Sequence, residues 1–257
     1  MWLNGQQIAN NDLDRGLQFG DGHFTTLTRE NGRLRWWPQH WQRLVSASAR
    51  LRMGLPDEAE VLECLAQIDA PDAIIKIIIT RGSGARGYGY TQAVTSNWYV
   101  THSPLPERKT YPLNCAIAQF SLARSSFFAG LKTLNRLEQV MLSAERDSRL
   151  LDELIVCDSE GFVIEATSSN IFLRREGEWH TPKLDFAGID GIVRQQILAG
   201  RPIGNVHISR VNVHDLSNVE QAFVTNTVLG LRPLAKIGDH KLPEQQLPKA
   251  LKTWWQS

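Results

Sequence analysis

Residues 101–112 read Thr-His-Ser-Pro-Leu-Pro-Glu-Arg-Lys-Thr-Tyr-Pro and mark the clearest change of composition along the chain. Each proline fixes a backbone angle and removes a hydrogen-bond donor, so three prolines in so short a stretch oppose regular structure. We therefore interpret part of this stretch as a linker. The chain then consists of a small N-terminal domain (residues 1–103), a linker (residues 104–112) and a larger C-terminal domain (residues 113–257).

Upstream of the linker, the spacing of apolar residues predicts alternating strands and helices. Asn31-Gly32 is a hairpin signal because both residues tolerate a positive φ. The run Ala73–Arg81 is unbroken and rich in β-branched residues, which predicts a strand buried on both faces. We expect strands over residues 24–29, 33–37, 73–81 and 97–101. One helix is expected to begin at Pro38, and a second helix is expected over about residues 57–68.

Downstream of the linker, strands outnumber helices and the order is mixed. Strands are expected over residues 113–120, 153–158, 162–165, 170–174 and 221–225, with helices over about 136–150, from near 191, and over 243–255. A chain with this mixture is typical of an α+β protein, here one with two subdomains.

Composition excludes several classes of protein. The 257 residues contain 28 Lys+Arg and 27 Asp+Glu, a net charge of +1, which does not suit a general nucleic-acid binder. The longest apolar run, residues 73–80, is broken by Lys76 and too short to span a membrane. No signal peptide is visible, and three cysteines without close spacing favour a reducing compartment. We expect a cytoplasmic protein without nucleic-acid or membrane partners.

Two residues are candidates for chemistry. Lys132 lies between a predicted strand and a predicted helix, where a desolvated amine can act as a nucleophile, although a solvated surface lysine is the commoner case. Glu165 follows three apolar residues and precedes small polar ones, so its carboxylate is expected to be partly buried and to need a partner. The alternative for Glu165 is an exposed position on an alternating strand.

Other segments could bind anions. Arg43 offers a bidentate fork on a predicted helix, although a surface charge is the simpler interpretation. Residues 188–194 begin a predicted helix after a glycine pair, which is either an anion site or a plain turn. Thr225-Asn226-Thr227 ends a predicted strand with hydroxyls that could supplement such a site.

A glycine-rich loop over residues 81–88 carries Arg81 and Arg86. It lacks the Gly-Lys-Ser/Thr ending of a nucleotide-binding P-loop, so we interpret it as a flexible loop that can close over an anionic substrate. The histidines show no metal-ligand spacing, and no Gly-x-Ser-x-Gly elbow for a serine hydrolase is present.

These motifs occur in a recognisable order along the chain. They are Asp14-Arg15-Gly16, Phe19-Gly20-Asp21-Gly22, His40-Trp41-Gln42-Arg43-Leu44, Lys132 with Asn135, Glu165 with Asn170-Ile171-Phe172, and Gly188–Arg194. The ordered set resembles the fold-type IV pyridoxal-phosphate enzymes, which include branched-chain and D-amino-acid aminotransferases and aminodeoxychorismate lyase. The resemblance runs from the first residues to Pro233 and implies a small α/β domain followed by a larger, barrel-like mixed α/β domain.

Within that family the chain resembles the lyase most closely in three segments, residues 18–26, 81–88 and 131–139. Arg136 stands where the aminotransferases usually carry leucine or tyrosine, which argues against simple transamination. The lyase removes pyruvate from 4-amino-4-deoxychorismate and leaves 4-aminobenzoate, a folate precursor. The alternatives are a D-amino-acid or branched-chain aminotransferase, or a cofactor-binding protein without turnover.

The resemblance also implies roles for individual residues. Lys132 would attach pyridoxal 5'-phosphate covalently and move protons, and Glu165 would pair with the pyridine nitrogen. The phosphate would be held by Arg43, the N–H groups of Ile192 and Val193, and Thr227. On chemical grounds we expect Arg81, Arg86 and Asn226 to bind the substrate carboxylates. The family also implies a homodimer.

Overall fold

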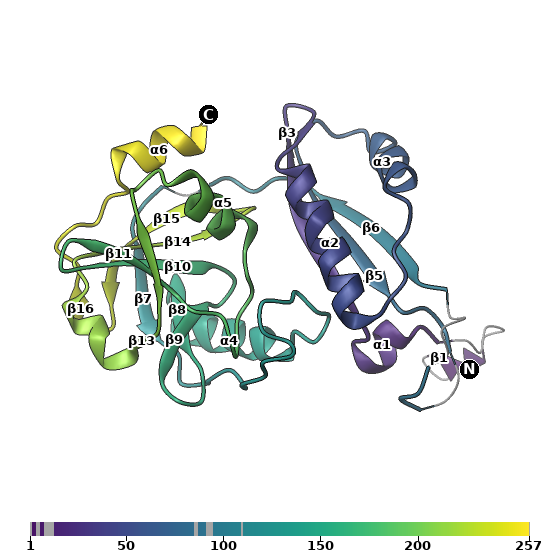
Figure 1. Cartoon of the computed structure of the whole chain (residues 1–257), viewed down its shortest axis with the longest axis horizontal. Helices are drawn as coiled ribbons and strands as arrows, with labels where there is room; N and C mark the ends of the chain where they lie inside the picture. Colours follow the sequence, from purple (N-terminus) through teal and green to yellow (C-terminus); the bar gives the residue numbers. More distant parts are fainter. Residues whose placement is uncertain are drawn as a thin grey trace. The chain divides into compact units, whose positions relative to one another are not determined.

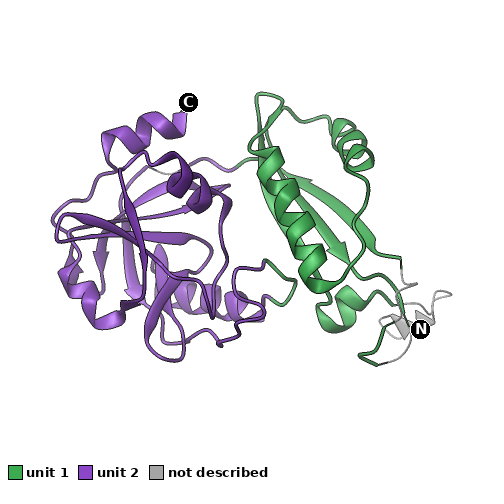
Figure 2. Ribbon diagram, viewed as in Figure 1, with its two compact units in different colours: residues 1–105, 132–135 green, residues 106–131, 136–257 purple. Residues whose placement is uncertain are grey.

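The computed structural model describes residues 2–3, 6–7, 13–84, 87–90, 95–108 and 110–256, and it divides into two compact units (Figures 1 and 2). Unit 1 comprises Met1–Leu105 together with Lys132–Asn135, and unit 2 comprises Pro106–Leu131 and Arg136–Ser257. The linker predicted over residues 104–112 stays a prediction.

Unit 1 is built on a four-stranded antiparallel sheet in the order β4-β3-β5-β6. Its helices include α2, whose buried residues His40, Leu44, Ala47 and Ser48 recur at helical spacing and pack on β3. Its elements are β1 (Trp2–Leu3), β2 (Gln6–Gln7), α1 (Arg15–Phe19), β3 (Gly22–Glu30), β4 (Arg33–Leu34), α2 (Trp37–Leu51), α3 (Glu58–Ala66), β5 (Ala73–Thr80) and β6 (Asn97–Ser103).

The central strand β5 differs from the sequence-based expectation. Ala73, Ile75, Ile77 and Ile79 are fully buried, whereas the residues between them are only partly buried. The prediction of a strand buried on both faces is therefore wrong. Burial alternates along the strand, but the sequence does not show this alternation because isoleucines also occupy the less buried face.

A four-residue segment distant in sequence completes the edge of β3. The short strand β4 pairs only with the end of β3, at Arg29 and Glu30. At the beginning of β3, the Phe24 N–H donates to the Lys132 carbonyl at 3.0 Å, and the Leu134 N–H donates to the Gly22 carbonyl at 2.9 Å. These bonds explain why Lys132–Asn135 belongs to unit 1.

Unit 2 contains a ten-stranded mixed sheet in the order β12-β11-β10-β14-β15-β7-β8-β9-β13, with β16 paired to β15. Although β9 is far from β10 and β11 in this order, it packs against both, so the sheet curls on itself. Its elements are β7 (Leu113–Ile117), α4 (Leu137–Ser148), β8 (Glu153–Cys157), β9 (Phe162–Ala166), β10 (Asn170–Arg175), β11 (Glu178–Pro182), α5 (Ile192–Gly200), β12 (Val206–Ser209), β13 (Val211–Asn212), the 3-10 helix Val213–Asn218, β14 (Gln221–Asn226), β15 (Gly230–Ile237), β16 (His240–Lys241) and α6 (Lys249–Gln256).

Helices join two of the parallel strand pairs of unit 2. α4 connects β7 to β8 and α5 connects β11 to β12, as parallel neighbours require. The main core lies between the curled faces and includes Ile155, Val163, Ile171, Val224 and Leu234. The predicted α+β class with two subdomains is confirmed.

Several predicted boundaries are wrong. The predicted strand 113–120 ends at Ile117, the second strand of the hairpin ends at Leu34, and the final helix begins at Lys249 rather than residue 243. The sequence patterns did not predict β1, β2, α1, β11, β12, β13, β15 or β16.

Candidate active site

Glu165 lies on β9 and is buried, with 4% of its surface exposed. Its Oε2 accepts a hydrogen bond of 2.9 Å from the backbone N–H of Ile189. Glu165 also interacts electrostatically with Arg136. Burial lowers the pKa of the Arg136 guanidinium, and the negative charges of Glu165 and Glu138 act against this decrease. A buried carboxylate thus faces the segment that leads into α5.

Asn170, the first residue of β10, holds the beginning of α5 in place. Its Oδ1 accepts from the Gly191 N–H at 3.0 Å, and its Nδ2 donates to the Ile189 carbonyl at 2.8 Å. Gly191 is the N-cap of α5, and no side chain caps the helix there. The first N–H groups of the helix, those of Ile192 and Val193, cannot be satisfied within the helix, which makes this end suited to an anion.

The segment directly before Lys132 pairs with the same stretch of unit 2. Gly130 donates its N–H to the Gly188 carbonyl at 2.9 Å, and its carbonyl accepts from the Asp190 N–H at 3.2 Å. Gly130 has a φ of +82°, a conformation that favours glycine. Lys132 is the second residue after Gly130 along the chain.

Lys132 and Arg43 both lie in unit 1, close to His40. Burial, together with the positive charges of Arg43 and Lys132, lowers the pKa of His40 to about 3. The His40 Nδ1 is hydrogen-bonded to the Thr25 hydroxyl at 2.6 Å. The Lys132 Nζ lies 4.6 Å from the centre of the Phe24 ring. His40 is therefore a neutral residue beside two cations.

Asn226 ends β14 and its side chain holds the turn that carries Thr227. Its Nδ2 donates to the Ser168 carbonyl and the Ser169 hydroxyl, and its Oδ1 accepts from the N–H groups of Val228 and Leu229 at 3.0 and 2.7 Å. These four contacts use the donors and acceptors of an amide. They favour a structural role for Asn226.

Arg81 is also engaged by protein groups. Its Nε donates to both oxygens of Asp21, and its Nη1 and Nη2 donate to the carbonyls of Arg52 and Leu51 at 2.8 and 3.0 Å. Its guanidinium lies 3.8 Å from the centre of the Tyr90 ring. A substrate carboxylate would have to compete with these contacts. Arg86, the other loop arginine of the prediction, lies outside the described residues.

Three residues of these surroundings were not singled out by the sequence. Asn170, His40 and Asp190 each stand within a quoted motif, but none of them is assigned a role from the sequence. Asp190 accepts from Arg194 Nη1 at 2.7 Å, one turn into α5. The only sequence signal for Asn170 is its place five residues after Glu165, at the start of the next strand.

Comparisons with known proteins agree over nearly the whole chain. Residues 22–237 match the family described as Amino-transferase class IV. A Vibrio harveyi protein named aminodeoxychorismate lyase is 28% identical over 247 residues, covering 92% of this chain and 90% of its own. A putative branched-chain-amino-acid aminotransferase of Methanocaldococcus jannaschii is 24% identical over 268 residues, covering 98% and 92%.

The solved structure of 4-amino-4-deoxychorismate lyase from Pseudomonas aeruginosa superimposes with a TM-score of 0.83. It is 30% identical in sequence, and the alignment covers 98% of this chain and 95% of that one. Because the family match spans residues 22–237, more than half of the chain, the chain belongs to the class IV aminotransferase family of enzymes.

Proposed function

We propose that the chain is a pyridoxal-phosphate-dependent lyase that converts 4-amino-4-deoxychorismate to 4-aminobenzoate and pyruvate. The observation that carries this specific activity is the 30% identity to the Pseudomonas aeruginosa lyase over 98% of the chain. The similarity to the Vibrio harveyi lyase points the same way. The substrate is then a small molecule.

The residues of unit 2 suit the two ends of pyridoxal 5'-phosphate. A buried carboxylate such as Glu165 is stabilised by a cationic partner, which a protonated pyridine nitrogen supplies. The uncapped end of α5 offers the N–H groups of Ile192 and Val193 to a phosphate, and Thr227 adds a hydroxyl. When bound, this cofactor supplies an electron sink for the bond that breaks.

Lys132 is the proposed covalent attachment point of the cofactor and the proposed proton carrier. An amine loses its proton more readily near other cations, and unit 1 places Arg43 in the same neighbourhood around His40. His40 stays neutral there, so it adds no repulsion to Lys132 or to the proposed phosphate ligand Arg43. Lys132 would take the proton from the ring carbon that bears nitrogen, and loss of the enolpyruvyl group would leave an aromatic ring.

The two carboxylates of the substrate each need a ligand on the protein. Arg86 keeps its proposed role as one such ligand. Arg81 and Asn226 can serve only if they exchange the contacts that they make with Asp21 and with the turn at Val228. We therefore propose that these two residues shape the loops around the substrate.

The family implies a homodimer, and unit 2 has a surface that suits one. Leu137, Val140 and Met141 occupy one face of α4 and are 73%, 59% and 52% exposed. Exposed apolar faces of this kind commonly mark protein interfaces. We propose this face of α4 as part of a contact with a second copy of the chain.

We also propose a cytoplasmic location. Cys64, Cys115 and Cys157 are all free thiols, as a reducing compartment favours. In the described part of the chain, no helix is both long enough and apolar enough to cross a bilayer.

One assay separates the lyase from the alternative, a D-amino-acid or branched-chain aminotransferase. Cofactor-saturated protein is given 4-amino-4-deoxychorismate without any keto acid, and 4-aminobenzoate and pyruvate are measured. The lyase produces both in equal amounts. If neither forms, while an amino acid and a keto acid exchange their amine, the aminotransferase is the correct assignment.

A further inference from the structure

Lys76 is a second lysine on the aromatic ring that Lys132 contacts. It lies on β5, and its Nζ is 4.6 Å from the centre of the Phe24 ring, the same distance as the Nζ of Lys132. The two nitrogen atoms are therefore no more than twice 4.6 Å apart. An aromatic face attracts a cation, so Phe24 holds both side chains in one neighbourhood. All three residues belong to unit 1.

The strand pairing fixes the position of Lys76. β5 is paired along its length with β3 on one side and β6 on the other, with Lys76 opposite Thr26 and Thr101. α2 packs on the face of β3 that carries Thr25, whose hydroxyl is hydrogen-bonded to that helix. Because side chains alternate along a strand, Lys76, Thr26 and Phe24 project from the opposite face. Lys76 thus begins at a central strand, on the same face as Phe24.

The sheet positions around Lys76 carry no acidic side chain, and the structure describes all of them. Residues directly opposite, and those two positions along each strand, share the face of Lys76. These neighbours are Phe24, Thr26, Thr28, Ile74, Ile78, Tyr99, Thr101 and Ser103. In the described part of the chain, no group accepts a hydrogen bond from the Lys76 ammonium or forms an ion pair with it. A partly buried cation without a carboxylate partner is suited to an external anion.

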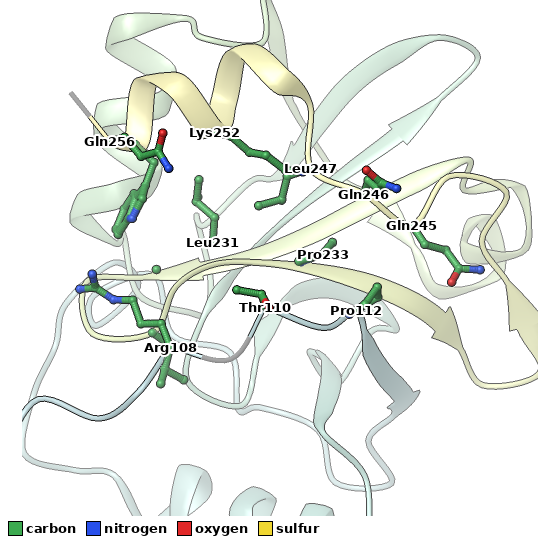
Figure 3. A pocket seen from close by; sticks show the side chains of 13 residues that line it. Arg108, Thr110, Pro112, Leu231, Pro233, Gln245, Gln246, Leu247, Lys252 and Gln256 are labelled. Atoms are coloured by element: carbon green, nitrogen blue, oxygen red, sulfur yellow. The ribbon is translucent and has the colours of Figure 1, made fainter.

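Other cations are engaged by protein groups. Arg81 donates to a carboxylate and to two backbone carbonyls. Arg108 lies at the wall of a cavity of about 560 Å³ between β15 and α6 (Figure 3). There it donates to the Val228 carbonyl at 2.8 Å, and its guanidinium lies 5.5 Å from the centre of the Trp255 ring. Lys76 differs from both, because all three of its N–H donors remain available.

The proposed substrate brings an anion to the neighbourhood of Lys76. In the proposed reaction, Lys132 contacts the ring carbon that bears nitrogen. One carboxylate of the substrate lies across the six-membered ring from that carbon, and the enolpyruvyl group with the other is attached to the adjacent carbon. Both carboxylates are therefore within reach of a second cation that lies against the same aromatic ring as Lys132.

From this geometry we propose that Lys76 binds a carboxylate of the substrate. The proposal rests on the proposed function and deepens it, because it names a residue that favours a ring substrate with two carboxylates over a simple amino acid. It also supplies a carboxylate ligand where Arg81 and Asn226 are occupied by contacts within the protein.

The kinetic test replaces the charge and keeps the shape of the side chain. Lys76→Met retains a long apolar stem, so with 4-amino-4-deoxychorismate it should raise KM about tenfold and leave kcat within about threefold. Lys76→Gln should behave in the same way, whereas Lys76→Arg keeps the charge and should bring KM to within about threefold of wild type. Arg33→Met is the matched control, because Arg33 is an exposed cation on the edge strand β4 of the same sheet. It should change neither KM nor kcat.

A binding measurement without turnover accompanies the kinetics. Chorismate carries the same two carboxylates but has a hydroxyl in place of the amine, so it does not undergo the reaction. Calorimetric titration of the cofactor-saturated protein should show one chorismate site per chain. Lys76→Met should weaken this binding about tenfold, and Arg33→Met should leave it unchanged.

Three results would overturn the proposal. The first is a wild-type protein that binds no chorismate. The second is a Lys76→Met variant whose KM and chorismate affinity stay within about twofold of wild type, or an equal loss in Arg33→Met. The third is a lower kcat at unchanged KM in Lys76→Met, because Lys76 would then act on Lys132 and not on the substrate. Failure of the proposed function is a separate result, since the wild-type protein itself would then form no 4-aminobenzoate.

Discussion

Gly191→Ala should destabilise the start of α5 through a single steric conflict. The Cβ of an alanine at this position would lie 2.0 Å from Asn170 Oδ1, far inside van der Waals contact. The backbone itself tolerates the change, since Gly191 has φ −69° and ψ 143°, which any L-residue adopts. The conflict can be relieved only if the Asn170 side chain moves.

The size of the effect follows from the bonds that Asn170 would lose. It is 5% exposed and makes hydrogen bonds of 3.0 Å from Gly191 N–H and 2.8 Å to the Ile189 carbonyl. Losing both while leaving buried groups unpaired should lower the free energy of unfolding by about 2–4 kcal/mol. In a protein of this size that is a drop in melting temperature of about 5–15 °C.

A double-mutant cycle followed by scanning calorimetry tests this explanation. Asn170→Ala alone should lower the free energy of unfolding by about 2 kcal/mol. In the Asn170→Ala background the oxygen is absent, so adding Gly191→Ala should lower it by less than about 1 kcal/mol. Gly89→Ala is the control, because a Cβ there meets nothing within 4 Å. Equal effects of Gly191→Ala in both backgrounds would refute the steric reasoning.

Three further outcomes are expected. Cofactor-saturated protein should show a visible absorption band that borohydride abolishes and that Lys132→Ala lacks, and a band retained in Lys132→Ala would reject the proposed attachment. Burial lowers the pKa of His23 to about 4 and of His40 to about 3, so both bind protons more readily when unfolded. The free energy of unfolding should then fall as the pH drops below 6.5, by up to about 1.4 kcal/mol per pH unit for each histidine. His23→Gln should reduce this slope in urea titrations, and an unchanged slope would contradict the assignment. Arg81→Ala should destabilise unit 1 by about 2 kcal/mol, because Asp21 keeps Arg15 but loses Arg81 and the carbonyls of Leu51 and Arg52 lose their donors, and a melting temperature within one degree of wild type would show that these contacts are not structural.

Local signals in the sequence predicted local structure well. Asn31 and Gly32 have φ values of 50° and 76°, as the hairpin signal requires, and the turn joins β3 to β4. Asp57 accepts from the Ala59 N–H at the start of α3, close to the predicted start of that helix. In both cases a few neighbouring residues determine the backbone conformation, so the local sequence is enough to predict it.

The features that were missed depend on distant partners. β15 contains Pro233, which argues against a strand, yet the strand is held between β14 and β7. Lys132–Asn135 joins unit 1 only because β4 leaves the start of β3 uncovered. Neither cause is visible in the local sequence.

The same limit applies to the candidate site. The sequence could indicate Glu165 because its polar neighbours are local, and the structure buries that carboxylate. Arg81 was predicted as a substrate ligand because a glycine-rich loop with arginines suits anions. The structure shows Arg81 donating to the carbonyls of Leu51 and Arg52, about thirty residues earlier, and its role as a substrate ligand stays a prediction. The role of an arginine depends on the groups that it contacts in the folded chain, and these groups are not visible in the local sequence.

Arg136 is the residue at which the proposed substrate preference can be tested. It is the N-cap of α4 and its charge interacts with Glu165. The lyase substrate carries two carboxylates, whereas most amino acids carry only one. Because Arg81 and Asn226 already make contacts within the protein, Arg136 is a cation near Glu165 that could meet the second carboxylate.

Arg136→Leu should therefore lower kcat/KM for the lyase reaction about tenfold, mainly through KM, because a charge-assisted contact is lost. Exchange of an amine between an amino acid and a keto acid should be less affected. Arg149→Leu removes an exposed arginine from the other end of α4 and should change neither reaction. If Arg136→Leu keeps its lyase kcat/KM within twofold, or if Arg149→Leu loses as much, Arg136 does not recognise the substrate. Arg136→Lys then separates charge from shape, because only a bidentate contact with a carboxylate requires the guanidinium.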